Sequence, residues 1–190
     1  MTSLTETFSP DATNMIRLDH THVLATFHQY KTSSRPQVKR GLVNTACIAL
    51  EIHAQLEEEI FYPAVRELTD NEALRKAVPE HDEMRRLIAL LRSMEPTDVR
   101  YDATFMELMR DVLHHVADEE TVVLPEAERL LEGHLGDLGM RMTKRRLQLA
   151  APRAGEIAAN MARALPGPSL AVTLSMLAAG LWLGMRIARA

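Results

Sequence analysis

The sequence predicts an all-α protein whose central part is an antiparallel, up-and-down four-helix bundle. Aromatic residues make up only 4% of the 190 residues, whereas Leu, Ala, Met, Glu and Arg are abundant, and this composition favours helix over strand. Apolar residues (46%) and charged residues (25%) have the proportions of a globular chain that buries a core. A pattern of His and Glu also recurs after about 61 residues, which indicates two similar helix pairs.

Five helices are expected, at about residues 13–32, 38–66, 71–93, 102–132 and 136–163. Turn residues separate them at Ser33 to Pro36 and at Glu95 to Asp98, and Thr69-Asp70-Asn71-Glu72 resembles a helix cap. The chain then divides into an N-terminal extension (1–12), the bundle (13–132), a basic connecting helix (133–164) and an apolar helix (165–187). Short turns between long helices make antiparallel packing the simplest arrangement.

The repeat carries the residues that bear chemistry. His53 to Pro63 reads HAQLEEEIFYP, and His115 to Pro125 reads HVADEETVVLP in the same register. Each half also has an acid and a histidine upstream, Asp19-His20 and Glu80-His81. Because residues four apart share a helix face, each His-x-x-x-Glu offers a nitrogen and an oxygen to one point. Four imidazoles, one per bundle helix, and two carboxylates could therefore build a two-metal site.

The type of donor limits the metal. A single histidine on an apolar helix is more often a packed residue than a ligand, but buried carboxylates such as Glu57 and Glu119 are costly unless they are paired or bind metal. Imidazole and carboxylate donors without thiolate suit iron, manganese or zinc, and do not suit calcium. Six such donors leave room for a bridging oxo or hydroxo group and for O2, NO or peroxide.

These residues also carry a family resemblance. The strings DHTHVLATF, HAQLEEEIFYP, EHDEMRRLI and HHVADEETVVLP resemble the four helices of the hemerythrin-like, or HHE cation-binding, domain family over about residues 13–132. The segment LGDLGMRMTKRRLQL resembles the fifth helix that often follows in bacterial members. The resemblance implies a non-haem di-iron centre, with manganese as the alternative metal, held by His20, His53, Glu57, His81, His115 and Glu119.

Two positions depart from the oxygen-carrying hemerythrins. Those proteins place a second histidine four residues after the third-helix histidine, where this chain has Arg85, and an Asp where it has Glu120. The pattern is closer to members linked to oxidative or nitrosative stress, iron-centre repair and iron sensing. It implies ferroxidase, peroxidase or catalase-like, or NO-reducing activity if the protein is an enzyme. The alternative is a non-catalytic module that stores or reports iron.

Other polar residues near the predicted ligands are assigned supporting roles. Ligating imidazoles usually donate their second N–H to an acceptor, which makes Glu58, Glu59 and Glu120 candidate partners, although Glu59 is expected mainly on a solvated face. Tyr62 is expected mainly to pack in the core, and His22, His28 and His114 mainly to face away from the site. A ferritin-like site needs Glu-x-x-His on two helices, and no Glu stands three residues before a helical histidine.

Charge and cysteine content limit the partners. Residues 1–139 hold 14 Lys and Arg against 25 Asp and Glu, whereas residues 140–190 hold 8 against 1. The acidic body disfavours nucleic acid as a partner. The single cysteine, Cys47, excludes an intrachain disulfide, and no secretory signal is visible, which favours the cytoplasm.

The C-terminal tail is the second feature of interest. No charged residue occurs from Leu165 to Met185, a length just sufficient to span a bilayer. Residues 165–187 are expected either to anchor the protein to the inner face of a membrane, in contact with lipid, or to pack on the bundle or on a second copy. The other expected partners are a small gaseous or peroxide ligand and an unidentified redox partner.

Overall fold

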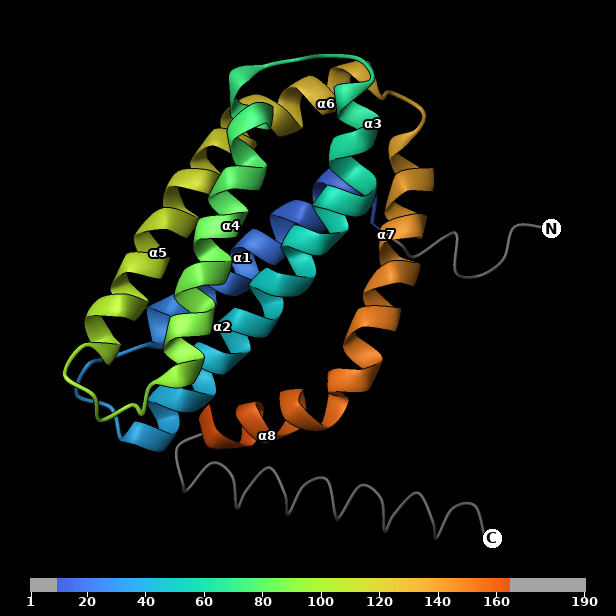
Figure 1. The fold of residues 1–190 in the computed structure, drawn as a ribbon. Helices are drawn as coiled ribbons and strands as arrows, with labels where there is room; N and C mark the ends of the chain where they lie inside the picture. Colours follow the sequence, from blue (N-terminus) through green and yellow to red (C-terminus); the bar gives the residue numbers. More distant parts are fainter. Residues whose placement is uncertain (1–9, 165–190) are drawn as a thin grey trace, which may run out of the picture.

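The computed structural model describes residues 10–164, and within this range all regular structure is helical (Figure 1). In chain order the elements are α1 (Ala12–Gln29), α2 (Pro36–Leu56), η1 (Glu57–Phe61), α3 (Tyr62–Arg66), α4 (Glu72–Ser93), α5 (Tyr101–Asp118), η2 (Glu119–Val123), α6 (Leu124–Leu130), α7 (Leu135–Ala150), η3 (Ala151–Arg153) and α8 (Ala154–Ala164). The segments α2–η1–α3 and α5–η2–α6 are each one continuous helix. The prediction of an all-α fold is confirmed.

Side chains cap the starts of two of the four bundle helices, α1 and α4. The carboxylate of Asp11 accepts a hydrogen bond from the backbone N–H of Asn14 at 2.8 Å, and Asn71 accepts from the N–H of Leu74 at 2.7 Å. Each satisfies a donor that the first turn of a helix leaves free. The cap predicted at Asn71 is therefore confirmed. The first helix ends at Gln29, three residues earlier than expected, and the extended Tyr30 places its ring in the core.

Two π-helical turns interrupt the long helices, and the sequence did not predict them. In η1 the N–H of Tyr62 bonds to the carbonyl of Glu57, and in η2 the N–H of Leu124 bonds to the carbonyl of Glu119. Both turns precede a proline, Pro63 or Pro125, whose ring in a regular α-helix would clash with the carbonyl four residues back. The wider turn relieves this clash, and it begins at a predicted metal ligand in both halves.

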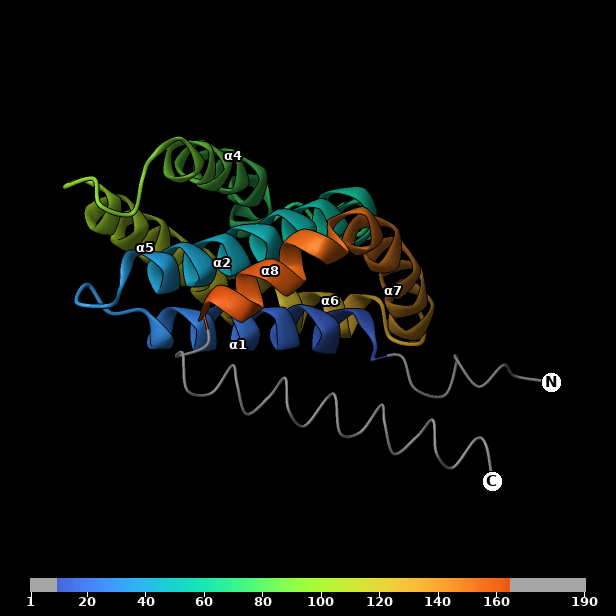
Figure 2. The ribbon, with the colours of Figure 1, turned by 90° about the horizontal axis from the view of Figure 1, so that it is seen from below.

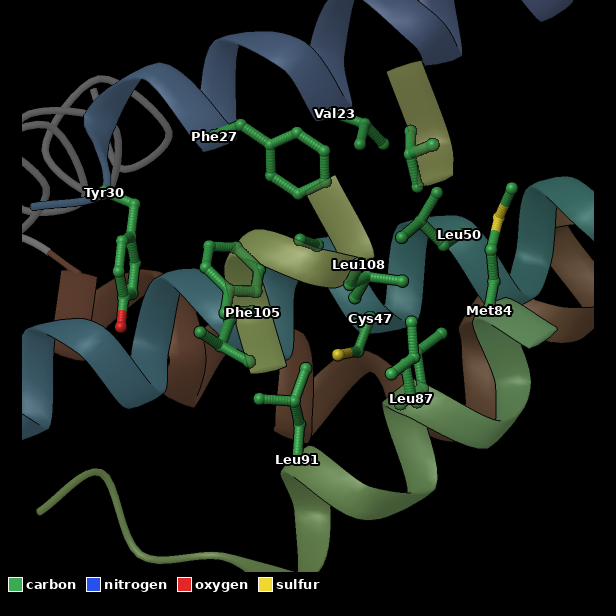
Figure 3. Close-up of a cluster of buried hydrophobic side chains, with 14 of the residues drawn as sticks. Val23, Phe27, Tyr30, Cys47, Leu50, Met84, Leu87, Leu91, Phe105 and Leu108 are labelled. Carbon is green, nitrogen blue, oxygen red and sulfur yellow. The ribbon is translucent and has the colours of Figure 1, made fainter. Parts of the chain in front are cut away.

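The interior consists of two apolar cores separated by a polar layer. One core, shown in Figure 3, includes Phe27, Leu50, Leu87 and Phe105. The other contains residues from the opposite ends of the same helices, among them Ile16, Leu56, Ala77 and Val123. On every bundle helix, the predicted ligands lie in sequence between residues of the first core and residues of the second. The two cores therefore enclose the candidate site from above and below.

The connecting segment after the bundle differs from the prediction. The single helix expected over 136–163 is two helices, α7 and α8, separated at η3. Pro152 explains the break, because proline removes a backbone donor and crowds the preceding turn. α7 contacts α1, and α8 packs along α2 in the antiparallel direction (Figure 2). This packing is close, since a Cβ atom on Gly41 of α2 would lie 2.7 Å from the backbone nitrogen of Ala164.

The predicted apolar helix at 165–187 lies outside the described residues. Between residues 10 and 164, none of the helices has both the length and the apolar character that crossing a bilayer requires.

Candidate metal centre

All six predicted ligands are buried and converge on the layer between the two cores. α1, α2, α4 and α5 supply one histidine each, and the first residues of η1 and η2 supply the carboxylates. The ligand set is His20, His53, Glu57, His81, His115 and Glu119, and each side chain is at most 6% exposed. The spacing argument therefore selected residues that the fold brings together.

The histidines form two pairs. The rings of His20 and His53 have their centroids 5.0 Å apart, and those of His81 and His115 are 4.6 Å apart. Within the second pair the two Nε2 atoms are separated by 3.1 Å. Two unprotonated nitrogens at this distance repel each other, so a proton or a cation must lie between them.

The carboxylates connect the two pairs. Oε2 of Glu57 lies 3.2 Å from Nε2 of His53 and 3.4 Å from Nε2 of His81. Oε2 of Glu119 lies 3.2 Å from Nε2 of His20 and 3.3 Å from Nε2 of His115. Each carboxylate therefore faces one histidine from each of the two pairs.

The donor atoms are better placed to bind metal ions than to form hydrogen bonds with one another. Nε2 of His20, Nε2 of His53, Oε1 of Glu57 and Oε2 of Glu119 are buried without a hydrogen-bond partner, although some lie near a neighbour whose alignment is poor. Such atoms are costly to bury unless something satisfies them. Neighbouring ligands on an octahedral ion stand about 3 Å apart for bonds of about 2.1 Å, close to the separations found here.

Each ligating imidazole is also held from behind by an acid. The Nδ1 atoms of His20, His53, His81 and His115 lie within 3.3 Å of Glu120, Asp19, Glu58 and Glu80, respectively. A carboxylate can only accept, so Nδ1 carries the hydrogen and Nε2 is left to bind metal. The roles predicted for Glu58 and Glu120 are those that the structure shows. Asp19 and Glu80 were not assigned this role, although their repeated position before His20 and His81 was a signal for it.

Arginines fix two of these four acids. Both guanidinium Nη atoms of Arg146 on α7 donate to the carboxylate of Asp19. Arg85 donates from Nη2 to both oxygens of Glu58 at 2.7 Å. Arg85 therefore does not replace the histidine of the oxygen carriers as a ligand, and instead holds the acid behind His81.

Tyr62 takes part in the site as well as in the second core. Its hydroxyl lies 2.7 Å from Oε1 of Glu119 and 3.1 Å from Oε2 of Glu57. Burial and the charges of these two carboxylates raise the pKa of Tyr62 well above its usual value, so the hydroxyl keeps its proton. Core packing alone, the role expected from the sequence, does not describe this residue.

In the absence of metal, nearby carboxylates favour the protonated forms of His20, His81 and His115. Burial lowers the pKa of His115, but the charge of Glu119, whose Oε2 lies 3.3 Å from Nε2, and the hydrogen bond to Glu80 outweigh it and raise this pKa to about 10. The pKa values of His20 and His81 are also raised against burial, by Glu119 and Glu57 respectively. Burial alone would raise the pKa of Glu119, yet His115 and His20 hold it well below the usual value.

A small cavity adjoins the histidines on the side of the first core. Its apolar lining is Val23, Leu50, Ala54, Met84, Val112 and Val116. The cavity has room for about one water-sized molecule, close to 10 Å³.

The remaining histidines do not enter the site. His22, His28 and His114 are exposed, as expected, and His134 is exposed at the start of α7. Glu59 is exposed as well and pairs with Arg145. Among the described residues, the groups of His, Asp and Glu that are spaced to hold a metal are drawn entirely from the six predicted ligands.

The fold and the site together define a helical metal-binding protein with a buried cluster of histidines and carboxylates. A family model described as the hemerythrin HHE cation-binding domain matches residues 11–127, and the chain belongs to this family. The matched residues run from the start of α1 into α6 and stop before α7.

Two known proteins are similar to the chain. A crystal structure of a hemerythrin HHE cation-binding domain-containing protein from Mycobacterium kansasii superposes with a TM-score of 0.65 at 19% identity. It covers 82% of this chain and 99% of its own, and this likeness shows the fold. A curated relative from Nostoc sp., named DNA nickase, is 28% identical over 110 residues, which are 58% of this chain. The match spans about 31% of that relative's length.

Proposed function

We propose that the buried cluster holds two non-haem iron ions, with which the protein binds or reacts with a small gaseous or peroxide ligand. The observation that carries this proposal is that Glu57 and Glu119 each face two histidines, one from each pair. Carboxylates so placed can bridge two ions, and mixed imidazole and carboxylate donors suit iron. Manganese accepts the same donors and is the alternative metal.

The bound irons would supply electrons by cycling between the ferrous and ferric states. The chain supplies the surroundings of that chemistry. The two apolar cores exclude bulk water from the cluster, and the cavity beside the histidines, with room for about one water-sized molecule, favours a very small ligand. Tyr62 holds a proton between the carboxylates, where it can donate a hydrogen bond within the site.

Two roles are compatible with such a centre. In the first, the protein is an oxidoreductase of the oxidative or nitrosative stress response, with ferroxidase, peroxidase or catalase-like, or NO-reducing activity. In the second, it binds or reports iron without turnover, a role that the nearly complete burial of the ligands also supports. Catalytic consumption of a ligand separates these two functions.

The name of the Nostoc relative suggests DNA as a substrate, but we do not extend that activity to this chain. The similarity covers about 31% of the relative. Residues 1–139, which include the bundle, have 25 acidic against 14 basic residues and would repel phosphate groups.

The first test is the metal content. After anaerobic reconstitution with Fe(II) and desalting, we expect about two irons per chain, as the two histidine pairs require. His115→Ala should lose most of this iron, whereas His114→Ala, which changes the exposed neighbour, should keep it. A wild-type protein that retains no iron, or equal loss in both variants, contradicts the proposed site.

The second test is turnover. The iron-loaded protein is mixed with excess peroxide or NO, and the ligand is followed over time beside the His115→Ala variant. Repeated consumption per site supports the oxidoreductase. Binding of one equivalent with a spectral change, followed by no further consumption, supports the iron-binding or iron-reporting module.

A further inference from the structure

We infer that Arg146 on α7 is a positioning residue for the metal ligand His53 and acts through Asp19. The inference rests on the proposed function, and it extends the metal centre to a helix beyond the residues that the family model matches. It assigns α7 a role in metal binding in addition to covering the bundle.

The contact runs through a single carboxylate. Nη1 of Arg146 donates to Oδ1 of Asp19 at 2.7 Å, and Nη2 donates to Oδ2. The same Oδ2 lies 3.3 Å from Nδ1 of His53. A two-pronged contact fixes the plane of the carboxylate as well as its position, and the plane of the carboxylate aims the imidazole.

The contact is also sheltered. The side chain of Asp19 is 17% exposed and that of Arg146 is 32% exposed, so water screens this pair less than it screens a surface ion pair. Without the arginine, the aspartate could rotate toward solvent. His53 would then lose the acceptor that keeps its hydrogen on Nδ1 and its Nε2 free for metal.

α7 is firmly placed to make this contact. Leu138 and Met142, on the turns before Arg146, are buried in the second core. Gly139 lies so close to Pro10 and Asp11 that a Cβ atom there would overlap their backbone. The helix is therefore anchored against the start of α1, and Asp19 lies two turns further along α1.

Each of the four imidazoles pairs with an acid, and arginines in the described part of the chain hold only two of these acids, which supports the inference. Asp19 and Glu58 each receive an arginine, whereas no arginine in residues 10–164 donates a hydrogen bond to Glu80 or Glu120. The two acids that an arginine holds contact His53 and His81, respectively. These two histidines belong to different histidine pairs. Each metal position thus has one arginine-supported histidine, and α7 supplies the support for one of them.

Arg145 provides a matched control. It is the preceding residue on α7 and also forms an ion pair with a glutamate, Glu59. Glu59 contacts Gln55 and no histidine. Arg145→Gln therefore removes the same charge from the same helix without touching a ligand's support.

The test measures Fe(II) affinity anaerobically, by competition with a chromophoric chelator, for the full-length wild type, Arg146→Gln, Arg145→Gln and Asp19→Asn. Loss of a residue that supports a ligand typically weakens metal binding about 10- to 100-fold. We expect Asp19→Asn to weaken the binding of one of the two iron equivalents by a factor in that range. Arg146→Gln should weaken the binding of the same equivalent about 10-fold. Arg145→Gln should leave both equivalents unchanged. Arg146→Lys, which keeps the charge but not the fork, should fall between Arg146→Gln and the wild type.

A second measurement needs no metal. In the metal-free protein, long-range ¹H–¹⁵N spectra of the imidazoles report which nitrogen of His53 carries hydrogen. We expect Arg146→Gln to shift the His53 signals, and Arg145→Gln to leave them in place. Circular dichroism confirms that each variant is folded.

Three results would overturn the inference. They are Fe(II) affinities of Arg146→Gln within a factor of about two of those of Arg145→Gln, equal weakening of both iron equivalents, and unchanged His53 signals in Arg146→Gln. If the wild type binds no iron, the proposed function fails, and the His53 spectra still decide whether Arg146 positions that ring.

Discussion

Glu58 accepts a hydrogen bond from Nδ1 of His81 at 2.8 Å, so the first helix pair orients a ligand of the second pair. The reciprocal contact joins Glu120 of the second pair to His20 of the first at 2.9 Å. Asp19 and Glu80 instead support histidines within their own half, His53 and His115. The internal repeat thus extends to the acids behind the ligands, and exchanged contacts connect the two halves.

Arg85 should support the metal position opposite to that of Arg146. Because Arg85 holds Glu58 behind His81, we expect Arg85→Gln to weaken the iron equivalent of the His81 and His115 pair about 10-fold. Chelator competition measures this, with Arg86→Gln as the control, since Arg86 pairs with the exposed Glu83. If the control Arg86→Gln changed the affinity for both iron equivalents, the role assigned to Arg85 would be refuted.

Combining the two arginine substitutions should give independent effects. Arg85 and Arg146 share no partner, so the double variant should weaken both equivalents, each by the factor found in the single variant. A double variant that loses one equivalent only would show that both arginines serve the same ion.

The stability of the metal-free protein should depend on pH through His115. Its pKa is raised from 6.5 to about 10, because the charge of Glu119 and the hydrogen bond to Glu80 overcome the opposing effect of burial. Protonation of His115 then contributes stability fully below pH 6.5, and this contribution is lost as the pH rises toward 10. We expect the metal-free melting temperature to fall across this window, and His115→Gln to flatten the fall.

Metal binding should also release protons. At pH 7 His115 holds a proton that an incoming ion must displace. A pH indicator in weak buffer should therefore show acidification when metal-free protein takes up Zn(II), and less of it with His115→Gln. Uptake of metal without proton release would contradict the pKa assigned to this histidine.

Replacing Tyr62 tests the hydroxyl between the two carboxylates. Tyr62→Phe keeps the ring in the second core but removes a donor that faces Glu57 and Glu119. Hydrogen bonds to charged groups contribute about 1.5–3 kcal/mol, and we expect a loss of this size in the metal-free protein. Urea unfolding measures it. A variant as stable as the wild type would show that the hydroxyl does not stabilise the pair of carboxylates.

The packing of α8 along α2 can be tested at Gly41. A Cβ atom there would lie 2.7 Å from the nitrogen of Ala164 and 2.8 Å from the carbonyl oxygen of Asn160, so Gly41→Ala must push α8 away. Overpacking of this kind costs about 1–3 kcal/mol. Gly155→Ala, where nothing lies within 4 Å of the new atom, should instead be neutral or stabilising by up to about 1 kcal/mol. Unfolding experiments on both variants compare the two effects.

The sequence determined the helices and the candidate metal ligands, because both depend on local spacing. In each half of the chain the Glu follows the His by four residues, about one helix turn, and the repeat of this spacing identified the rest of the candidate set. Helix ends and breaks were less well predicted. Pro152 divides the connecting helix, and the effect of Pro63 and Pro125 on the helix turn was not foreseen.

Only the tertiary structure decided which groups surround the ligands. Arg146 is 127 residues from the aspartate that it holds, and Tyr62 is 57 residues from Glu119. No periodicity within a helix encodes such contacts, since they depend on how the helices pack against one another. The sequence by itself therefore established which residues could bind metal, and the packing of α7 and of the two helix pairs established how those residues are held.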